Sequence, residues 1–322
     1  KKGSNLIYFG PGVHNLPNDT LFVPSGTTVY IDGGARVYGN IFTEGAHDVN
    51  IFGRGEVHPD GRGAGVWVRR SKNVRIDGIV VSQLPIGQCD SVELTNVKSI
   101  SYYGWGDGMD VFSSSNVILD GVFCRNSDDC AAVYASTQGF KGGSNNVLVK
   151  NATLWADVAH PINIGGHGDP NGMDTVQNVT FRNIDILDQA EKQIDYQGCL
   201  AINPGDNTLV RNITFENIRI EDFRNGQLVN FRISFNPKYC VSTGRGIQNV
   251  LVKDVTYNGS GENLSIIAGY DENHKISGIR FVNLVVNGRK ITDDMPGKPK
   301  WYKTGDMAGI FVGEHVENLS FE

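Results

Sequence analysis

Apolar and polar residues alternate in short runs along most of the chain, and the runs repeat. One phrase returns as NVRIDGIVV, NVILDGVFC, NVLVKNATL, NVTFRNIDI, NITFENIRI, NVLVKDVTY and GIRFVNLVV, beginning at residues 73, 116, 146, 178, 212, 249 and 278. From the second copy onward, successive starts are 30, 32, 34, 37 and 29 residues apart. Period-two alternation that breaks at Asn, Asp or Gly is typical of short strands, and no amphipathic helical stretch separates the copies. The pattern therefore predicts a solenoid of strands.

Helical and leucine-rich repeats do not fit, because the copies contain neither a helical segment nor a leucine consensus. We expect an all-β fold, a right-handed single-stranded parallel β-helix with about three short strands per coil. Asn at its corners can adopt left-handed backbone conformations and stack from coil to coil. The first part, residues 7–39, has the same texture and is expected to begin the β-helix. We expect one domain over residues 1–322; an N-terminal domain or a final coil outside this sequence stays an open alternative.

Composition narrows the possible partners. The 29 Lys and Arg residues against 35 Asp and Glu residues give a formal net charge of −6, which disfavours nucleic acid and anionic membranes. No run approaches the roughly 18 apolar residues of a membrane span. The five cysteines form no CxxC pair and indicate neither a zinc site nor a full disulfide framework, so buried free thiols are expected. They are Cys89, Cys124, Cys130, Cys199 and Cys240.

Acidic residues are concentrated in GDGMDVFSSSNVILDGVFCRNSDDC, residues 106–130. Asp107 and Asp128 are 21 residues apart, about one short coil, which predicts neighbouring rungs roughly 4.8 Å apart. Asp129 follows directly, and it can reach the same site only where the backbone bulges or turns. A corner ladder or a calcium site is one reading of these acids. An acid and a base acting on one glycosidic bond is the other, since close carboxylates drive their pKa values apart.

The stretch DGMDVFSSSNVILDGVFCRNSDDCAAVY resembles the core of the family 28 glycoside hydrolases, the polygalacturonases, and of the related family 49 dextranases and isopullulanases. The resemblance implies inverting hydrolysis of an α-linked polysaccharide or oligosaccharide, without a metal or other cofactor. By the same resemblance Asp128 is the general acid, and Asp107 and Asp129 position and deprotonate the attacking water.

Two histidines compete for the family's histidine position in WADVAHPINIGGHGD. In the family, GHG is followed by an apolar strand and then Gly. AHPINIGG is similar to this pattern in register, which places His160 at the family's histidine position. His160 is then expected to hydrogen-bond one of the acids and tune its proton affinity. His167, in the following loop, is expected at most to touch substrate, and a structural role stays open for both.

Departures from the family concern the substrate. Polygalacturonases carry an Arg-Ile-Lys motif that binds the uronate carboxylate, whereas the corresponding coil here reads QGCLAINPGD. A buried carboxylate without a cation is costly, which favours a neutral sugar over galacturonate. Arg232, one coil later, is the main objection, unless it pairs with a neighbouring acid. Trp105 replaces part of the family motif and is a candidate platform for a sugar ring, as is Tyr239; core packing is the alternative.

Two other functions stay open. A β-helical polysaccharide lyase would need calcium or another cation and would release an unsaturated product. A non-catalytic β-helix would only bind glycan. An enzyme acting on polysaccharide is expected to be secreted or periplasmic, and the oligomeric state is unknown from the sequence.

Overall fold

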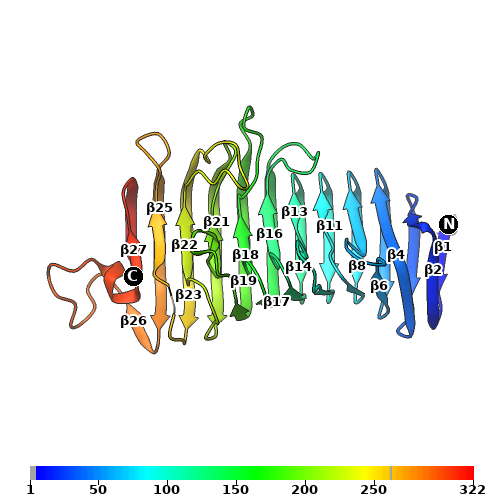
Figure 1. Ribbon diagram of the computed structural model, residues 1–322, viewed down its shortest axis with the longest axis horizontal. Helices are drawn as coiled ribbons and strands as arrows, with labels where there is room; N and C mark the ends of the chain where they lie inside the picture. Colours follow the sequence, from blue (N-terminus) through cyan, green and yellow to red (C-terminus); the bar gives the residue numbers. More distant parts are fainter. Residues whose placement is uncertain (1–4, 262) are drawn as a thin grey trace.

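The chain winds into a long stack of coils in which the strands of successive coils pair in parallel. The computed structural model describes residues 5–261 and 263–322, and all of its 28 strands belong to one continuous sheet. The chain advances coil by coil from the blue end to the red end of the stack (Figure 1). Within the described residues, β25 and β26 form the one antiparallel strand pair. The predicted parallel β-helix is confirmed.

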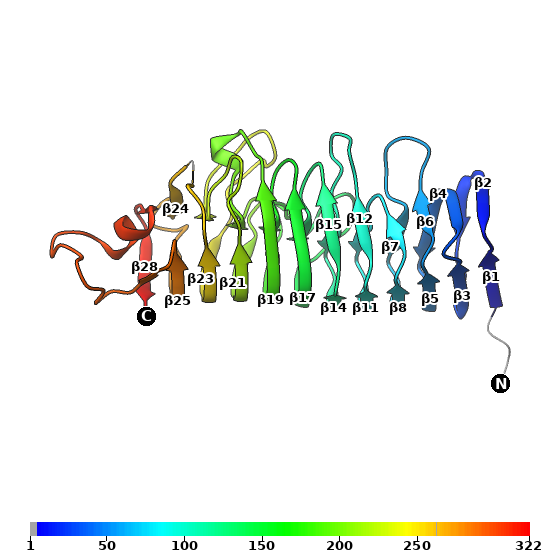
Figure 2. The same cartoon turned by 90° about the horizontal axis from the view of Figure 1, so that it is seen from below.

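Three ladders of strands run along the stack. The first ladder contains β1 (Asn5–Phe9), β3 (Thr27–Ile31), β5 (His47–Gly53), β8 (Lys72–Asp77), β11 (Asp90–Thr95), β14 (Ser115–Asp120), the first parts of β17 (Ser144–Ala156), β19 (Thr175–Gln189), β21 (Leu209–Ile220), β23 (Gly246–Tyr257) and β25 (Ile276–Val286), and finally β28 (Val316–Phe321). Figure 2 shows these strands aligned side by side.

The second ladder continues around the corner. It contains β2 (Gly12–Phe22), β4 (Ala35–Glu44), β6 (Glu56–His58), β9 (Val80–Val81), β12 (Lys98–Ile100), β15 (Phe123–Asn126), the later parts of the long strands β17 to β25, and the antiparallel β26 (Arg289–Ile291).

The third ladder has the shortest strands and carries the loops of greatest interest. It contains the end of β4, β7 (Val66–Arg69), β10 (Ile86–Gly87), β13 (Val111–Phe112), β16 (Ala131–Tyr134), β18 (Ile162–Ile164), β20 (Leu200–Ile202), β22 (Val229–Arg232), β24 (Ser265–Ala268) and β27 (Ile310–Val312). Two short 3-10 helices, η1 (Ile194–Tyr196) and η2 (Thr304–Ala308), lie in loops of the described chain. No helix in the described residues is long and apolar enough to cross a membrane.

The repeated phrase builds the core because the same inward position recurs on every coil. Its aliphatic side chains lie in register above one another and are almost fully buried. Burying such a side chain stabilises the fold by about 1.5 to 3 kcal/mol relative to leaving it in water. In register on the first ladder are Val49, Val74, Val92, Val117, Val147, Val179, Ile213, Val250 and Ile279.

Asparagine makes the corner between the first and second ladders. Asn151, Asn183 and Asn217 have φ of 55°, 56° and 55°, the left-handed region that Asn tolerates better than most residues. We call these three residues the asparagine ladder. Each side-chain amide donates to the coil before it: Asn151 to Asp120 at 2.8 Å, Asn183 to Asn151 at 2.7 Å and Asn217 to Asn183 at 3.2 Å. The predicted left-handed, stacked corner is confirmed.

Candidate active site

The acidic residues lie in the turns that lead into the third ladder. Asp107 precedes β13, the pair Asp128 and Asp129 precedes β16, and His160 precedes β18. Because β13 pairs with β16 and β16 with β18, these turns lie next to one another on consecutive coils. The expected neighbouring rungs are present.

The register of these turns differs by one residue from the count along the sequence. Val111 pairs with Val133, so the residue opposite Asp107 is Asp129 rather than Asp128. The backbone N–H of Gly108 accordingly donates to the carbonyl of Asp129 at 2.8 Å. The chain bends after β15, and the N–H of Asp129 donates to the side chain of Asp128 at 3.0 Å. This bend is the turn that the adjacent pair requires.

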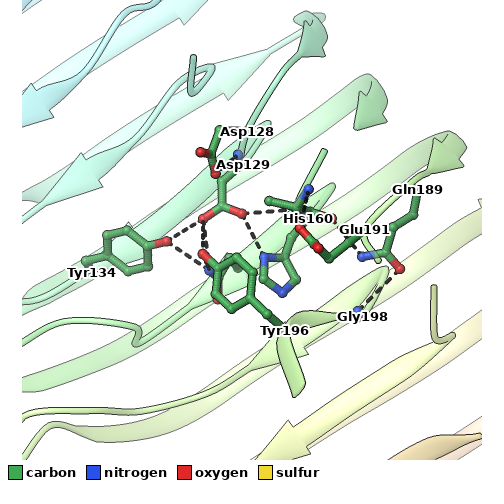
Figure 3. A network of polar contacts seen from close by, with 10 residues as sticks. Asp128, Asp129, Tyr134, His160, Gln189, Glu191, Tyr196 and Gly198 are labelled. Carbon is green, nitrogen blue, oxygen red and sulfur yellow. Dashed lines mark hydrogen bonds and ion pairs between the residues drawn. The ribbon is translucent and has the colours of Figure 1, made fainter. Parts of the chain in front are cut away.

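Asp129 is the centre of a buried hydrogen-bond network (Figure 3). One carboxylate oxygen accepts from Nδ1 of His160 at 2.7 Å and from its backbone N–H at 3.1 Å. The other accepts from the hydroxyl of Tyr134 at 2.5 Å and the amide of Asn163 at 2.9 Å, with the hydroxyl of Tyr196 at 3.4 Å. Burial opposes the charged form, but the charge and hydrogen bonds of His160 and the other donors outweigh it and lower the pKa of Asp129. Asp129 is therefore held as a carboxylate.

The pKa values of the neighbouring carboxyls are raised, in contrast to the lowered pKa of Asp129. Burial raises the pKa of Asp128 to about 8, and the charges of Asp129 and Asp107 add to the effect. Burial and the charge of Asp129 raise the pKa of Asp107 to about 7. Asp110 is almost completely buried, and burial followed by the charge of Asp107 raises its pKa well above the usual range. One ionised carboxylate thus lies beside three carboxyls that hold protons to much higher pH, an arrangement typical of acid–base sites.

A cavity of about 360 Å³ opens over these acids. Trp105 lies at its edge with a side chain 75% exposed and φ of 56°, a strained backbone conformation for a bulky residue. Tyr239 also lines it and stacks on Tyr196 with ring centroids 4.8 Å apart. The cavity therefore combines acidic side chains with an exposed tryptophan ring and a half-buried tyrosine ring.

The two histidines take different positions. The side chain of His160 is completely buried and contacts Asp129, while its ring packs edge-on against Tyr196 with centroids 4.3 Å apart. His167 lines the cavity and packs edge-on against Tyr134 with centroids 5.1 Å apart; burial lowers its pKa. The structure brings His160, and not His167, into hydrogen-bond contact with the acids.

The cleft continues on both sides of the acids. On the side of the earlier coils, Trp105 and Asp107 also line a second cavity, where the guanidinium of Arg62 lies 5.7 Å from the Trp105 ring. On the other side, Tyr196 and Tyr239 are shared with a cavity that contains Arg232. Hollows therefore adjoin the acid cavity on both sides, about 300 Å³ on the side of Arg62 and about 40 Å³ on the side of Arg232.

Arg232 keeps its charge available to this last cavity. Its guanidinium donates to the backbone carbonyl of Asp195, and its buried Nε has no hydrogen-bond partner among the described residues. Burial lowers the pKa of Arg232, with the charge of Asp195 acting in the opposite direction. β20, which pairs with β22 one coil before Arg232, reads Leu200-Ala201-Ile202 and brings no cation.

Four residues of the site gave little signal in the sequence. Asp110 stands three residues after Asp107 in DGMD, and this repetition was its only cue. Tyr134, Asn163 and Tyr196 contact Asp129 from separate coils, and Tyr196 is 67 residues away along the chain. Asn163 and Tyr196 carry no local motif, because only the stacking of coils brings them to this carboxylate, whereas Tyr134 stands five residues after Asp129 on the same coil.

Comparison with known proteins agrees with this geometry. The family model described as glycosyl hydrolases family 28 matches residues 64–295. The chain belongs to glycosyl hydrolase family 28. A polygalacturonase of Juniperus ashei is 26% identical to this family 28 chain over 216 residues, which cover 64% of this chain and 39% of that protein.

Solved structures support the same fold for the family 28 chain. The family 28 exopolygalacturonase of Yersinia enterocolitica superposes with a TM-score of 0.70 at 13% identity, over 99% of this chain and 73% of that one. Dex49A from Penicillium minioluteum superposes with a TM-score of 0.65 at 14% identity, over 98% and 60%. The chain spans about half the length of the first curated relatives that it matches.

Proposed function

We propose that this family 28 chain hydrolyses an α-glycosidic bond of a polysaccharide or oligosaccharide with inversion at the anomeric carbon. The observation that carries the proposal is the split among neighbouring carboxyls: Asp129 is held ionised, whereas Asp128 and Asp107 have pKa values of about 8 and about 7. A site that retains a proton at neutral pH beside a carboxylate supplies the acid and the base that glycosidic hydrolysis needs.

In the proposed mechanism Asp128 donates its proton to the glycosidic oxygen as the bond from that oxygen to the anomeric carbon breaks. Water adds to the anomeric carbon from the opposite face and transfers a proton to Asp107. Asp129 helps to position the water and stabilises the positive charge that develops on the sugar. We assign the proton acceptance to Asp107 because both oxygens of Asp129 already accept hydrogen bonds from His160, Tyr134 and Asn163.

His160 is proposed to act through Asp129. Its imidazole is completely buried, so it has no direct route to substrate, but its Nδ1 holds one oxygen of Asp129 at 2.7 Å. Trp105 and Tyr239 are proposed to stack on sugar rings on either side of the acids.

We propose a neutral sugar for the unit that occupies the acidic cavity. Five acidic residues line it, and among its described lining residues none is Lys or Arg. A substrate carboxylate there would be desolvated next to like charges. The five acids are Asp107, Asp110, Asp128, Asp129 and Glu191.

A galacturonate-containing chain is the second candidate, and Arg232 is the specific observation in its favour. Its guanidinium faces the adjoining cavity without a described carboxylate partner, and could receive a carboxylate of the next sugar unit. The relatives include polygalacturonases, which also favours a galacturonate-containing substrate. We propose that the protein acts on its polysaccharide outside the cytoplasm, secreted or periplasmic.

The test is product release from a panel of neutral and uronic α-glycans, with the anomer of the first product followed by NMR. We expect the inverted anomer, no effect of EDTA, and loss of release in Asp128→Asn. Asp120→Asn is the matched control, because Asp120 lies in the same segment but at the asparagine corner. A retained anomer would refute inversion. An unsaturated product that EDTA suppresses would replace the hydrolase by a lyase.

A further inference from the structure

Three turns beyond the acids come together in the same way as the catalytic turns. β18, β20 and β22 pair in parallel on consecutive coils, and each is followed by a turn on the same side of the stack. His167, Asp206 and Cys240 lie in these three turns. One ligand atom of each lies within 4.8 Å of the others, the single grouping of this kind that the described residues contain.

Hydrogen bonds to one oxygen hold the carboxylate of Asp206 in place and leave its other oxygen available. Its Oδ1 accepts the backbone N–H groups of Val241 at 2.8 Å and Ser242 at 3.3 Å, which ties the turn that carries Cys240 to this carboxylate. No described hydrogen bond uses the other oxygen. Asp206 is therefore a preorganised ligand rather than a mobile surface acid.

Cys240 is held against the turn of His167. Its thiol donates to the carbonyl of Gly166 at 3.2 Å. A side chain at Gly205 would place its Cβ only 2.2 Å from this sulfur, so the glycine permits the close approach. The other four cysteines are buried in the interior, whereas Cys240 is half-buried and lines the cavity of Arg232.

The imidazole of His167 is free to take a ligand. Its backbone carbonyl accepts from Ala135 and Thr208, but within the described part of the chain neither ring nitrogen has a hydrogen-bond partner. The ring is oriented by its edge contact with Tyr134. A half-buried histidine with two unused nitrogens beside a carboxylate and a thiol is not explained by packing alone.

We propose that His167, Asp206 and Cys240 bind a divalent transition-metal ion of the zinc, cobalt and nickel type. Imidazole with thiolate selects these ions over Mg²⁺ and Ca²⁺, which take oxygen ligands. Around a tetrahedral zinc the ligand atoms lie roughly 3.3 to 3.8 Å from one another. Atoms now at most 4.8 Å apart can reach this spacing by small side-chain rotations.

Three protein ligands leave a fourth position open. His167 and Cys240 both line the cavity that contains Arg232, so the open position faces the cleft. Metal binding is expected to release the proton of the Cys240 thiol to solvent. His167 also lines the acid cavity, so the site borders the acid cluster, but none of its three ligands belongs to that cluster and its existence does not depend on the proposed hydrolysis.

The test uses the whole chain, stripped of metal with a chelator, desalted and titrated with Co²⁺. We expect one ion per chain, with an intense near-ultraviolet band from sulfur-to-cobalt charge transfer. Cys240→Ser is expected to abolish the band. Asp206→Asn keeps an acceptor for Val241 and should weaken Co²⁺ binding by at least about tenfold, as even supporting contacts do at metal sites.

His274→Ala is the matched control, since His274 is a half-buried histidine that contacts Asp271 at 2.7 Å without a thiol nearby. It should leave Co²⁺ binding unchanged. Thermal unfolding without metal establishes that each variant is folded. A wild-type chain that binds no Co²⁺, a band that persists in Cys240→Ser, or binding that is lost in Asp128→Asn instead would each overturn the proposal.

Discussion

Asp120 and Asp128 lie eight residues apart on one coil, yet their carboxyls have opposite surroundings. Asp120 accepts from Asn151 at 2.8 Å and pairs with Lys150 at 3.1 Å, and these partners lower its pKa despite some burial. Asp128 is half-buried beside two other acids, and burial with their charges raises its pKa to about 8.

The difference between the asparagine corner and the acid cluster shows two uses of the same stacking. At the corner the next coil repeats the residue type, so each amide satisfies its neighbour and the arrangement stabilises the fold. At the cleft the next coil brings another carboxyl, so stacking produces repulsion and protons are retained. Polar residues that repeat serve structure here, and those that break the repeat form the candidate active site.

The largest expected effect separates activity from stability at the cleft. Asp128→Asn should lower kcat by about 10²- to 10⁴-fold, the usual contribution of a general acid. It should not lower the thermal unfolding midpoint. The native pKa of about 8 exceeds the unfolded value, so ionising Asp128 destabilises the fold as pH rises from about 4 to 8.

The midpoint of Asp128→Asn should therefore exceed that of the wild type at pH 8 and match it more closely at pH 4. Calorimetry at both pH values measures this. A variant that unfolds earlier at pH 8 would mean that Asp128 supports the fold as Asp120 does.

The second prediction concerns which acid accepts the proton. If Asp107 is the base, kcat/KM should fall tenfold per pH unit below about 7, while the loss of the Asp128 proton lowers it above about 8. If Asp129 is the base, its lowered pKa would extend the plateau to more acidic pH than an ordinary aspartate allows. The pH profile of kcat/KM distinguishes the two candidate bases. Its acidic and alkaline limbs report macroscopic pKa values that belong to the coupled acids together.

The third prediction tests the substrate. Arg232→Gln should change kcat/KM for a neutral glycan by less than about threefold, because no carboxylate then contacts it. For a uronic glycan the loss of a charged hydrogen bond, about 1.5 to 3 kcal/mol, should lower kcat/KM by roughly 10- to 150-fold. Parallel kinetics on the two substrates gives the ratio. An equal loss on both would show that Arg232 supports the loop at Asp195.

The smallest expected effect lies at the asparagine corner. Asn183→Ala should destabilise the fold by about 1 to 3 kcal/mol, since it removes hydrogen bonds and places Ala at φ of 56°. Asn183→Gly removes the same bonds without the backbone cost and should be less destabilising by about 1 kcal/mol. Denaturant unfolding measures both variants, and activity at 25 °C should be unchanged. Equal losses of stability in the two variants would show that the left-handed backbone conformation does not contribute to the effect of Asn183→Ala.

The sequence by itself determined the fold and the approximate location of the candidate site. Strand periodicity with Asn at recurring corners permits few architectures other than a β-helix, because each coil must bury the same inward positions. The spacing of Asp107 and Asp128 then put the acids on adjacent coils, and AHPINIGG put His160 on the next one.

Only the tertiary structure decided the exact partners and the proton affinities. Coil length varies, so the register that sets Asp129 opposite Asp107 depends on turns that no repeat count resolves. Tyr196 reaches Asp129 from two coils away, and His167, Asp206 and Cys240 meet across 39 and 34 residues of chain. Charge, burial and ligand geometry are properties of neighbours in space, and the sequence lists neighbours only along the chain.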